Sequence, residues 1–102
     1  MHAMFSHIVV FWVKPVPRHA TDELIAGANK LLKSIPGIVQ FHVGRTVSGK
    51  RTVVEQSYQV ALNLIFSNKK MHDAYQVHPQ HVEFMEKYFK RLVKKVVVYD
   101  FE

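Results

Sequence analysis

The hydrophobic pattern near the start of the chain predicts a strand that is buried on both faces. Residues 5–13 (FSHIVVFWV) are almost all apolar, and they include neither glycine nor proline. Because side chains alternate along a strand, this run divides into two faces. One face carries His7, Val9 and Phe11, and the other carries Ile8, Val10 and Trp12. A sheet with one solvated face would make one of these sets polar, so both faces here need cover.

Helical spacing of apolar residues predicts a helix over residues 21–33. Thr21 is placed to cap its N-terminus. Asp22 and Glu23 follow in the first turn, where the helix dipole favours negative charge. Residues 34–37 (SIPG) then end the helix.

A second helical region, divided by a proline, is predicted later in the chain. Ser67 is expected to cap a short helix over residues 68–76. Pro79 suits the first turn of a new helix, with His78 at its cap. Helical spacing then predicts one buried face on that helix, made of Val82, Met85, Phe89 and Leu92.

Three further strands complete the predicted fold. They cover residues 38–43, 57–66 and 94–101, each rich in β-branched or aromatic side chains. The resulting order is the β-α-β-β-α-β pattern of a ferredoxin-like α+β fold with a four-stranded antiparallel sheet. A chain of 102 residues has room for one such domain, over residues 1–102.

Both helices of this fold cover the same face of the sheet. The opposite face would carry Ile8, Val10 and Trp12, a larger apolar patch than a soluble monomer normally exposes. A twofold dimer, sheet against sheet, is the simplest way to cover it. We therefore expect a homodimer that is formed through these three residues.

Composition excludes several other classes of function. The chain has no cysteine, so disulfides and thiolate zinc sites are excluded. The net charge is +6, but the basic residues are scattered along the chain, and the sequence has neither a recognition-helix pattern nor an RNA-binding signature. We therefore expect no nucleic-acid partner. We assign no role to the basic loop over residues 45–56.

The N-terminus predicts a cytoplasmic protein without a membrane segment. Residues 1–4 (MHAM) show no basic region followed by a long apolar run, so no secretory signal is expected. The longest apolar stretch, residues 8–13, is far too short to span a bilayer.

The most distinctive candidate for chemistry is the segment over residues 75–81 (YQVHPQH). Pro79 sets the turn, and His81 follows His78 by about one helical turn, so both histidines can share a side with Tyr75. Histidine titrates near neutrality and suits proton transfer, while a tyrosine hydroxyl can donate to an oxyanion. The pair suits removal of a proton from a carbon beside a carbonyl. The alternative is a purely structural role in capping and loop hydrogen bonds.

His7 is a second candidate, although a lone histidine in an apolar strand is commonly a core residue. If its face looks toward the helices, His7 can close a pocket with Tyr75 and His81. A zinc site made by His72, His78 and His81, which could supply three nitrogens, is a further alternative. No carboxylate accompanies these histidines, and we expect neither a metal nor a cofactor.

Together, several motifs resemble the stress-responsive A/B barrel (Dabb) family. They are His7-Ile8-Val9-Val10-Phe11, Ile35-Pro36-Gly37-Ile38, Val43-Gly44, Tyr75-x-x-His78-Pro79-x-His81 and Val97-Val98-Tyr99-Asp100-Phe101. The resemblance covers residues 4–101 and implies a dimeric α+β barrel, in which two ferredoxin-like sheets pack face to face. One plant member, olivetolic acid cyclase, closes a polyketide ring by an aldol reaction in a cavity between sheet and helices.

The resemblance implies a set of site residues. Tyr75 and His81 match the catalytic tyrosine and histidine of the cyclase, and His7 and His78 match its two further histidines. We expect His7, Val9, Phe11 and His78 to contact a substrate. The function expected is a cofactor-free cyclase or lyase for a small carbonyl or polyketide-like compound. A non-catalytic, ligand-binding or stress-associated homo-oligomer is the first alternative. Other dimeric α+β barrels imply a third reading, a cofactor-free monooxygenase or haem-degrading enzyme, which ranks last because the sequence has no haem-ligand pattern.

Overall fold

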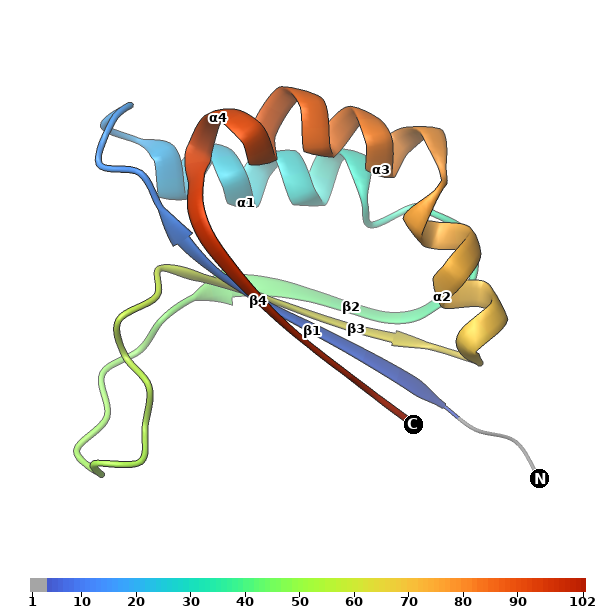
Figure 1. Ribbon diagram of the computed structural model, residues 1–102, viewed down its shortest axis with the longest axis horizontal. Helices are drawn as coiled ribbons and strands as arrows, with labels where there is room; N and C mark the ends of the chain where they lie inside the picture. Colours follow the sequence, from blue (N-terminus) through green and yellow to red (C-terminus); the bar gives the residue numbers. More distant parts are fainter. Residues whose placement is uncertain (1–3) are drawn as a thin grey trace.

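The computed structural model describes residues 4–102, and its helices lie on one face of a four-stranded antiparallel sheet (Figure 1). The strands are β1 Phe5–Val13, β2 Ile38–Arg45, β3 Val60–Phe66 and β4 Val93–Phe101. The helical elements are α1 Ala20–Leu31, α2 Lys69–Gln76, α3 Pro79–Phe84, the π-helical turn η1 Met85–Phe89 and α4 Lys90–Leu92. The strand order β2-β3-β1-β4 confirms the ferredoxin-like α+β prediction. The N-terminal segment in which no secretory signal is expected includes residues 1–3, which lie outside the described residues.

Strand β1 lies inside the sheet, between β3 and β4, and its alternation is as predicted. His7, Val9 and Phe11 are each at most 6% exposed and face the helices. The matching residues of β3 are almost completely buried: Val60, Leu62, Leu64 and Phe66. Full burial of one such apolar side chain contributes about 1.5–3 kcal/mol to folding, so this face is the core of the domain.

The opposite face of the sheet has no helix over it (Figure 1). Ile8, Val10 and Trp12 are half-buried there. The register pairs Ile8 with Tyr99 and Val10 with Val97, so edge strand β4 extends the same apolar face. Tyr99 remains 57% exposed. Trp12 is partly covered by its own chain, because Lys95 Nζ lies 4.5 Å from the centre of its ring and Tyr58 packs edge-on against it. The face as a whole therefore remains only partly covered in a single chain.

Two of the three predicted N-caps are shifted, by two residues in α1 and by one residue in α2. Helix α1 begins at Ala20, with His19 at the N-cap and no side-chain cap bond, because Ala20 is itself buried in the core. In α2 the cap is Asn68 and not Ser67, since the Asn68 side chain accepts a hydrogen bond from the Met71 backbone N–H at 3.0 Å. The expected cap at His78 is confirmed.

The buried face of the last helix differs from the prediction at Val82, which is 50% exposed, while Phe84 is buried. The cause is the π-helical turn η1, whose wider winding brings positions five residues apart onto one side. Phe84 and Phe89 consequently both face the space above the sheet. In a regular α-helix these two positions would point about 140° apart.

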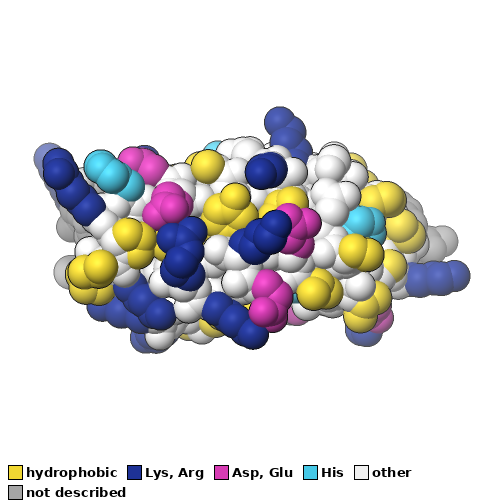
Figure 2. All heavy atoms as spheres, turned by 90° about the horizontal axis from the view of Figure 1, so that it is seen from above, with side chains coloured by type: hydrophobic (Ala, Val, Ile, Leu, Met, Phe, Trp, Pro, Cys, Tyr) yellow, Lys and Arg dark blue, Asp and Glu magenta, His cyan; other side chains and the backbone are white. Residues whose placement is uncertain are grey.

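Charged side chains on the helical side of the molecule are of both signs (Figure 2). Several form ion pairs one helical turn apart, such as Lys87 with Glu83 and Lys90 with Glu86, each at 2.8 Å. Within residues 4–102, no helix is both long enough and apolar enough to cross a membrane.

Gly27 in α1 packs directly against Tyr88 of the C-terminal helical region. A Cβ atom at this position would lie 2.6 Å from the Tyr88 ring. We therefore expect Gly27→Ala to lower the free energy of unfolding by about 1–3 kcal/mol in urea titrations, although alanine is the better helix former. In a Tyr88→Ala background the same change should be neutral or stabilising. Equal destabilisation in both backgrounds would contradict this packing.

Candidate functional site

A small apolar cavity lies between the covered face of the sheet and the helices α2 and α3. Its volume is about 150 Å³. The lining includes His7, Val9, Phe11, Leu62, Tyr75, His81, Phe84, Met85, Phe89, Val96 and Val98. Val96 and Val98 lie on the edge strand and are 37% and 46% exposed, so the cavity opens along β4. An apolar cavity of about this volume holds one benzene-sized molecule.

The structure brings together most of the residues expected at the site. Tyr75, His81, His7, Val9 and Phe11 all line the cavity. The remaining expected contact, His78, does not line it. Its Nδ1 atom accepts a hydrogen bond from the Gln80 backbone N–H at 3.1 Å and so caps α3. The two histidines of the His-Pro-x-His segment thus have different positions, one at a helix cap and one at the cavity.

Tyr75 is held firmly near the C-terminal end of α2, and its residue is only 1% exposed. Its ring packs against Phe66, with ring centres 5.1 Å apart, and meets His7 at 5.9 Å. Among residues 4–102 the Tyr75 hydroxyl has no hydrogen-bond partner. Every fully buried side-chain oxygen or nitrogen in the same residues does have a partner, so the Tyr75 hydroxyl oxygen is not fully buried. The hydroxyl oxygen therefore reaches the open space of the cavity. Burial raises the pKa of the Tyr75 phenol well above its usual value, which keeps it a hydrogen-bond donor.

His81 lies in the first turn of α3, next to Tyr75. The two rings meet edge to face with centres 4.8 Å apart. Nothing in the described chain forms a hydrogen bond with the His81 imidazole, which is partly exposed. Burial lowers the pKa of His81 below its ordinary value, and His7 and His72 lower it further. The ring is thus neutral at pH 7, with a free lone pair to accept a proton.

His7 is fixed by a carboxylate that the sequence did not identify as part of the site. The β1–β4 register pairs His7 with Asp100, and His7 Nδ1 lies 2.5 Å from Asp100 Oδ1. Burial lowers the pKa of His7, although the hydrogen bond to Asp100 acts in the opposite direction. A neutral His7 donates its Nδ1–H to Asp100 and carries its lone pair on Nε2.

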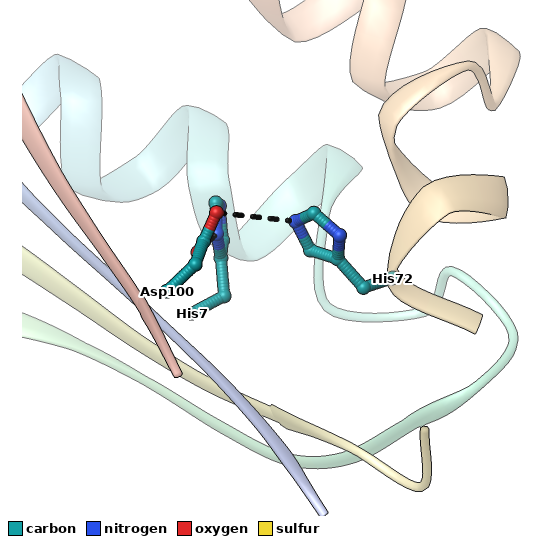
Figure 3. Close-up of side chains that lie close together, drawn as sticks. All are labelled: His7, His72 and Asp100. Carbon is teal, nitrogen blue, oxygen red and sulfur yellow. Dashed lines mark hydrogen bonds and ion pairs between the residues drawn. The ribbon is translucent and has the colours of Figure 1, made fainter. Parts of the chain in front are cut away.

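His72 is a second buried histidine beside this pair, and it comes from α2 (Figure 3). Its Nε2 lies 3.9 Å from the other oxygen of Asp100, and its ring centre is 4.8 Å from that of His7. One nitrogen from each of His7 and His72 and an oxygen of Asp100 all lie within 4.8 Å of one another. This group, rather than His72, His78 and His81, is the histidine-containing cluster that the described part of the chain assembles.

Stability should depend on pH through His81. The unfolded chain takes up a proton at His81 near pH 6.5, whereas the folded protein does so only at lower pH. As the pH falls below 6.5 the unfolded state therefore binds more protons, and the folded state is progressively destabilised. Urea midpoints should fall between pH 7.5 and pH 5.0, and less so in His81→Gln. The exposed His19→Gln is the matched control, and an equal fall in all three proteins would contradict the assignment.

Comparison with known proteins is consistent with this architecture. A stress-response A/B barrel domain-containing protein of Arabidopsis thaliana is 30% identical over 97 residues, which cover 95% of this chain and 84% of that protein. A Dabb family protein with a ferredoxin-like fold from Mesorhizobium loti has a TM-score of 0.79 and 25% identity, over 100% of this chain and 97% of that one.

Two more distant structures share the fold. A dimeric protein of unknown function from Bacteroides fragilis is 23% identical, with a TM-score of 0.75 and coverage of 97% and 95%. The hydroxynitrile lyase of Passiflora edulis is 20% identical, with a TM-score of 0.76 and coverage of 96% and 91%. The family model of the stress responsive A/B barrel domain matches residues 5–102. The chain therefore belongs to the stress-responsive A/B barrel domain family.

Proposed function

We propose that this protein is a cofactor-free enzyme that makes or breaks a carbon–carbon bond in a small carbonyl compound. The observation that carries the proposal is the pairing of two unengaged groups at one apolar cavity. Within residues 4–102 the Tyr75 hydroxyl and the His81 imidazole have no hydrogen-bond partner, and both border the cavity. Purely structural residues would be expected to use their polar atoms in internal hydrogen bonds.

The chemistry assigns one role to each group. His81 removes a proton from the carbon beside the carbonyl, and the electron pair of that C–H bond moves toward the carbonyl oxygen to give an enolate. Tyr75 donates its O–H to this oxygen and stabilises the developing charge. The enolate carbon can then attack a second carbonyl carbon, whose oxygen takes up the proton from His81. The reverse sequence cleaves the same bond, as a lyase does.

The size of the cavity limits the substrate. About 150 Å³ accommodates a single-ring aromatic or a short aliphatic carbonyl compound, but not an extended polyketide chain. Because Val96 and Val98 leave the β4 edge open, a longer substituent would extend into solvent there. A lyase with this fold, the Passiflora edulis enzyme, supports the view that the architecture is compatible with such chemistry.

The protein is further proposed to act as a homodimer through the open face of its sheet. Ile8, Val10 and Trp12, with Val97 and Tyr99 from β4, form a mainly apolar surface opposite the cavity, with Lys95 lying over the Trp12 ring. A related structure of the same fold is described as dimeric. Face-to-face packing of two such sheets would bury this surface and leave the opening along β4 on the other side of the sheet.

Proton removal can be measured directly with acetophenone, a small aromatic ketone, in D₂O. The wild-type protein should accelerate exchange of the methyl protons for deuterium, followed by proton NMR. His81→Gln should reduce the protein-dependent rate by about 10²–10⁴-fold because it removes the base. Tyr75→Phe should reduce it by about 10²–10³-fold because it removes the oxyanion donor.

The control for this experiment is His19→Gln, which changes an exposed histidine far from the cavity and should leave the exchange rate unchanged. Thermal-shift measurements on the same proteins report binding separately from exchange. Stabilisation by acetophenone without any exchange would favour the non-catalytic binding role. A rate that is insensitive to His81→Gln would refute the role of His81.

The dimer is tested by a charge at the centre of the open face. Val10→Glu would place an unpaired carboxylate in the interface at a cost of about 3 kcal/mol or more, which weakens dimerisation at least about 100-fold. Sedimentation equilibrium should then show a monomer at micromolar concentration, while wild type and the loop variant Val16→Glu remain dimeric. Val16 is 75% exposed and serves as the matched control. A monomeric wild type would contradict the proposal.

A further inference from the structure

The histidine–carboxylate cluster at the end of the cavity invites a separate explanation. His7 and His72 are largely buried, with side chains 6% and 10% exposed, whereas the Asp100 side chain is 38% exposed. Among the ion pairs of residues 4–102, Asp100 contacts only these two histidines and no lysine or arginine. No lysine or arginine among the described residues therefore forms an ion pair that would balance the negative charge of Asp100.

We propose that His7, His72 and Asp100 bind one divalent transition-metal ion of the zinc class. Two imidazole nitrogens and one carboxylate oxygen are a common ligand set for zinc, with further positions left for water or a ligand. Figure 3 shows the groups converging from β1, β4 and α2. These segments are far apart in the sequence and meet only through the strand register and the position of α2 over the sheet.

The three candidate ligand atoms lie within 4.8 Å of one another, so side-chain rotations are needed to bring them to the separations that a metal requires. Ligand atoms about 2.1 Å from one tetrahedral zinc ion are roughly 3.4 Å apart. His72 Nε2 and Asp100 Oδ2 are 3.9 Å apart, and His7 Nδ1 and Asp100 Oδ1 are 2.5 Å apart. Rotation of the partly exposed Asp100 side chain would close the first distance and open the second. The ion would then take the place of the proton on His7 Nδ1, and the ring would carry its N–H on Nε2. The exposure of Asp100 also provides an entry path for the ion.

The orientation of His72 is the second argument for a metal. Its Nδ1 lies 3.1 Å from Asp73 Oδ1, and Lys69 holds the other oxygen of Asp73 at 2.8 Å. The His72 ring stacks on Phe5, with centres 4.3 Å apart. His72 Nε2 also lies 3.3 Å from the side-chain amide nitrogen of Gln76, and an ion would replace this contact. A carboxylate that orients a histidine through one nitrogen, while the other nitrogen binds the ion, is the usual support of a metal ligand.

The site is distinct from the proposed catalytic pair but adjacent to it. His72 and Asp100 are not among the residues that line the cavity, whereas His7 belongs to both groups. An ion at the cluster would therefore lie next to a molecule in the cavity. The proposal does not depend on the enzymatic role of Tyr75 and His81, because it rests on different side chains and is tested by metal binding alone.

The test is isothermal titration of the protein, free of any affinity tag and pretreated with a chelator, with ZnCl₂. We expect one ion per chain in wild type, and a Co²⁺-loaded sample should show the visible absorption of a coordinated ion. His72→Gln and Asp100→Asn should each weaken Zn²⁺ binding by at least about 100-fold, and Asp73→Asn by about tenfold. His19→Gln is the matched control and should bind like wild type.

Two results would overturn the proposal. One is the absence of saturable uptake of one Zn²⁺ per chain by folded wild-type protein. The other is uptake that Asp100→Asn leaves unchanged, which would assign the ion to surface histidines. Asp100 lies on an edge strand and is partly exposed, so Asp100→Asn should fold. The Asp100→Asn measurement therefore keeps the test valid even if His72→Gln fails to fold.

Discussion

The structure depends on one constraint, the alternation of an almost wholly apolar inner strand. In β1 the side chains of Phe5, His7, Val9 and Phe11 face the helices and are buried, and the residues between the last three, Ile8 and Val10, are apolar as well. The helices can cover only one side, because the order of the elements places all of them on the same face. The two faces consequently have different environments: one forms the core and the cavity, and the other remains as an apolar surface for a second chain.

The cavity follows from how the helical region after β3 is divided. Pro79 and the His78 cap begin a new helix after α2, which lets Tyr75 and His81 meet although they belong to different helices. The π-helical turn then directs Phe84 and Phe89 to the same space. Burial among aromatic and aliphatic side chains raises the pKa of the Tyr75 phenol and lowers the pKa of His81, which favours a protonated phenol and a neutral imidazole. These are the protonation states that a hydrogen-bond donor and a general base require.

Local patterns in the sequence were sufficient for the features that depend on nearest neighbours. The alternation of β1 and the cap at His78 were predicted correctly, since each depends on residues adjacent in the chain. Asp100 was not identified as a site residue, because its contact with His7 depends on the register of two strands 93 residues apart. The proximity of His72 to Asp100 depends on how α2 lies over the sheet, which no local pattern indicates. The exposure of Val82 was missed because a π-helical turn leaves no clear periodic signal.

Methyl NMR with acetophenone tests the division of β1 into two environments most directly. Val9 and Val10 are neighbours in the chain, yet they lie on opposite faces of the sheet. The account predicts that the ligand shifts the methyl signals of Val9, Leu62, Val96 and Val98, while those of Ile8, Val10 and Val97 remain in place. Shifts confined to Ile8, Val10 and Val97, or shifts in neither set at saturating ligand, would contradict it.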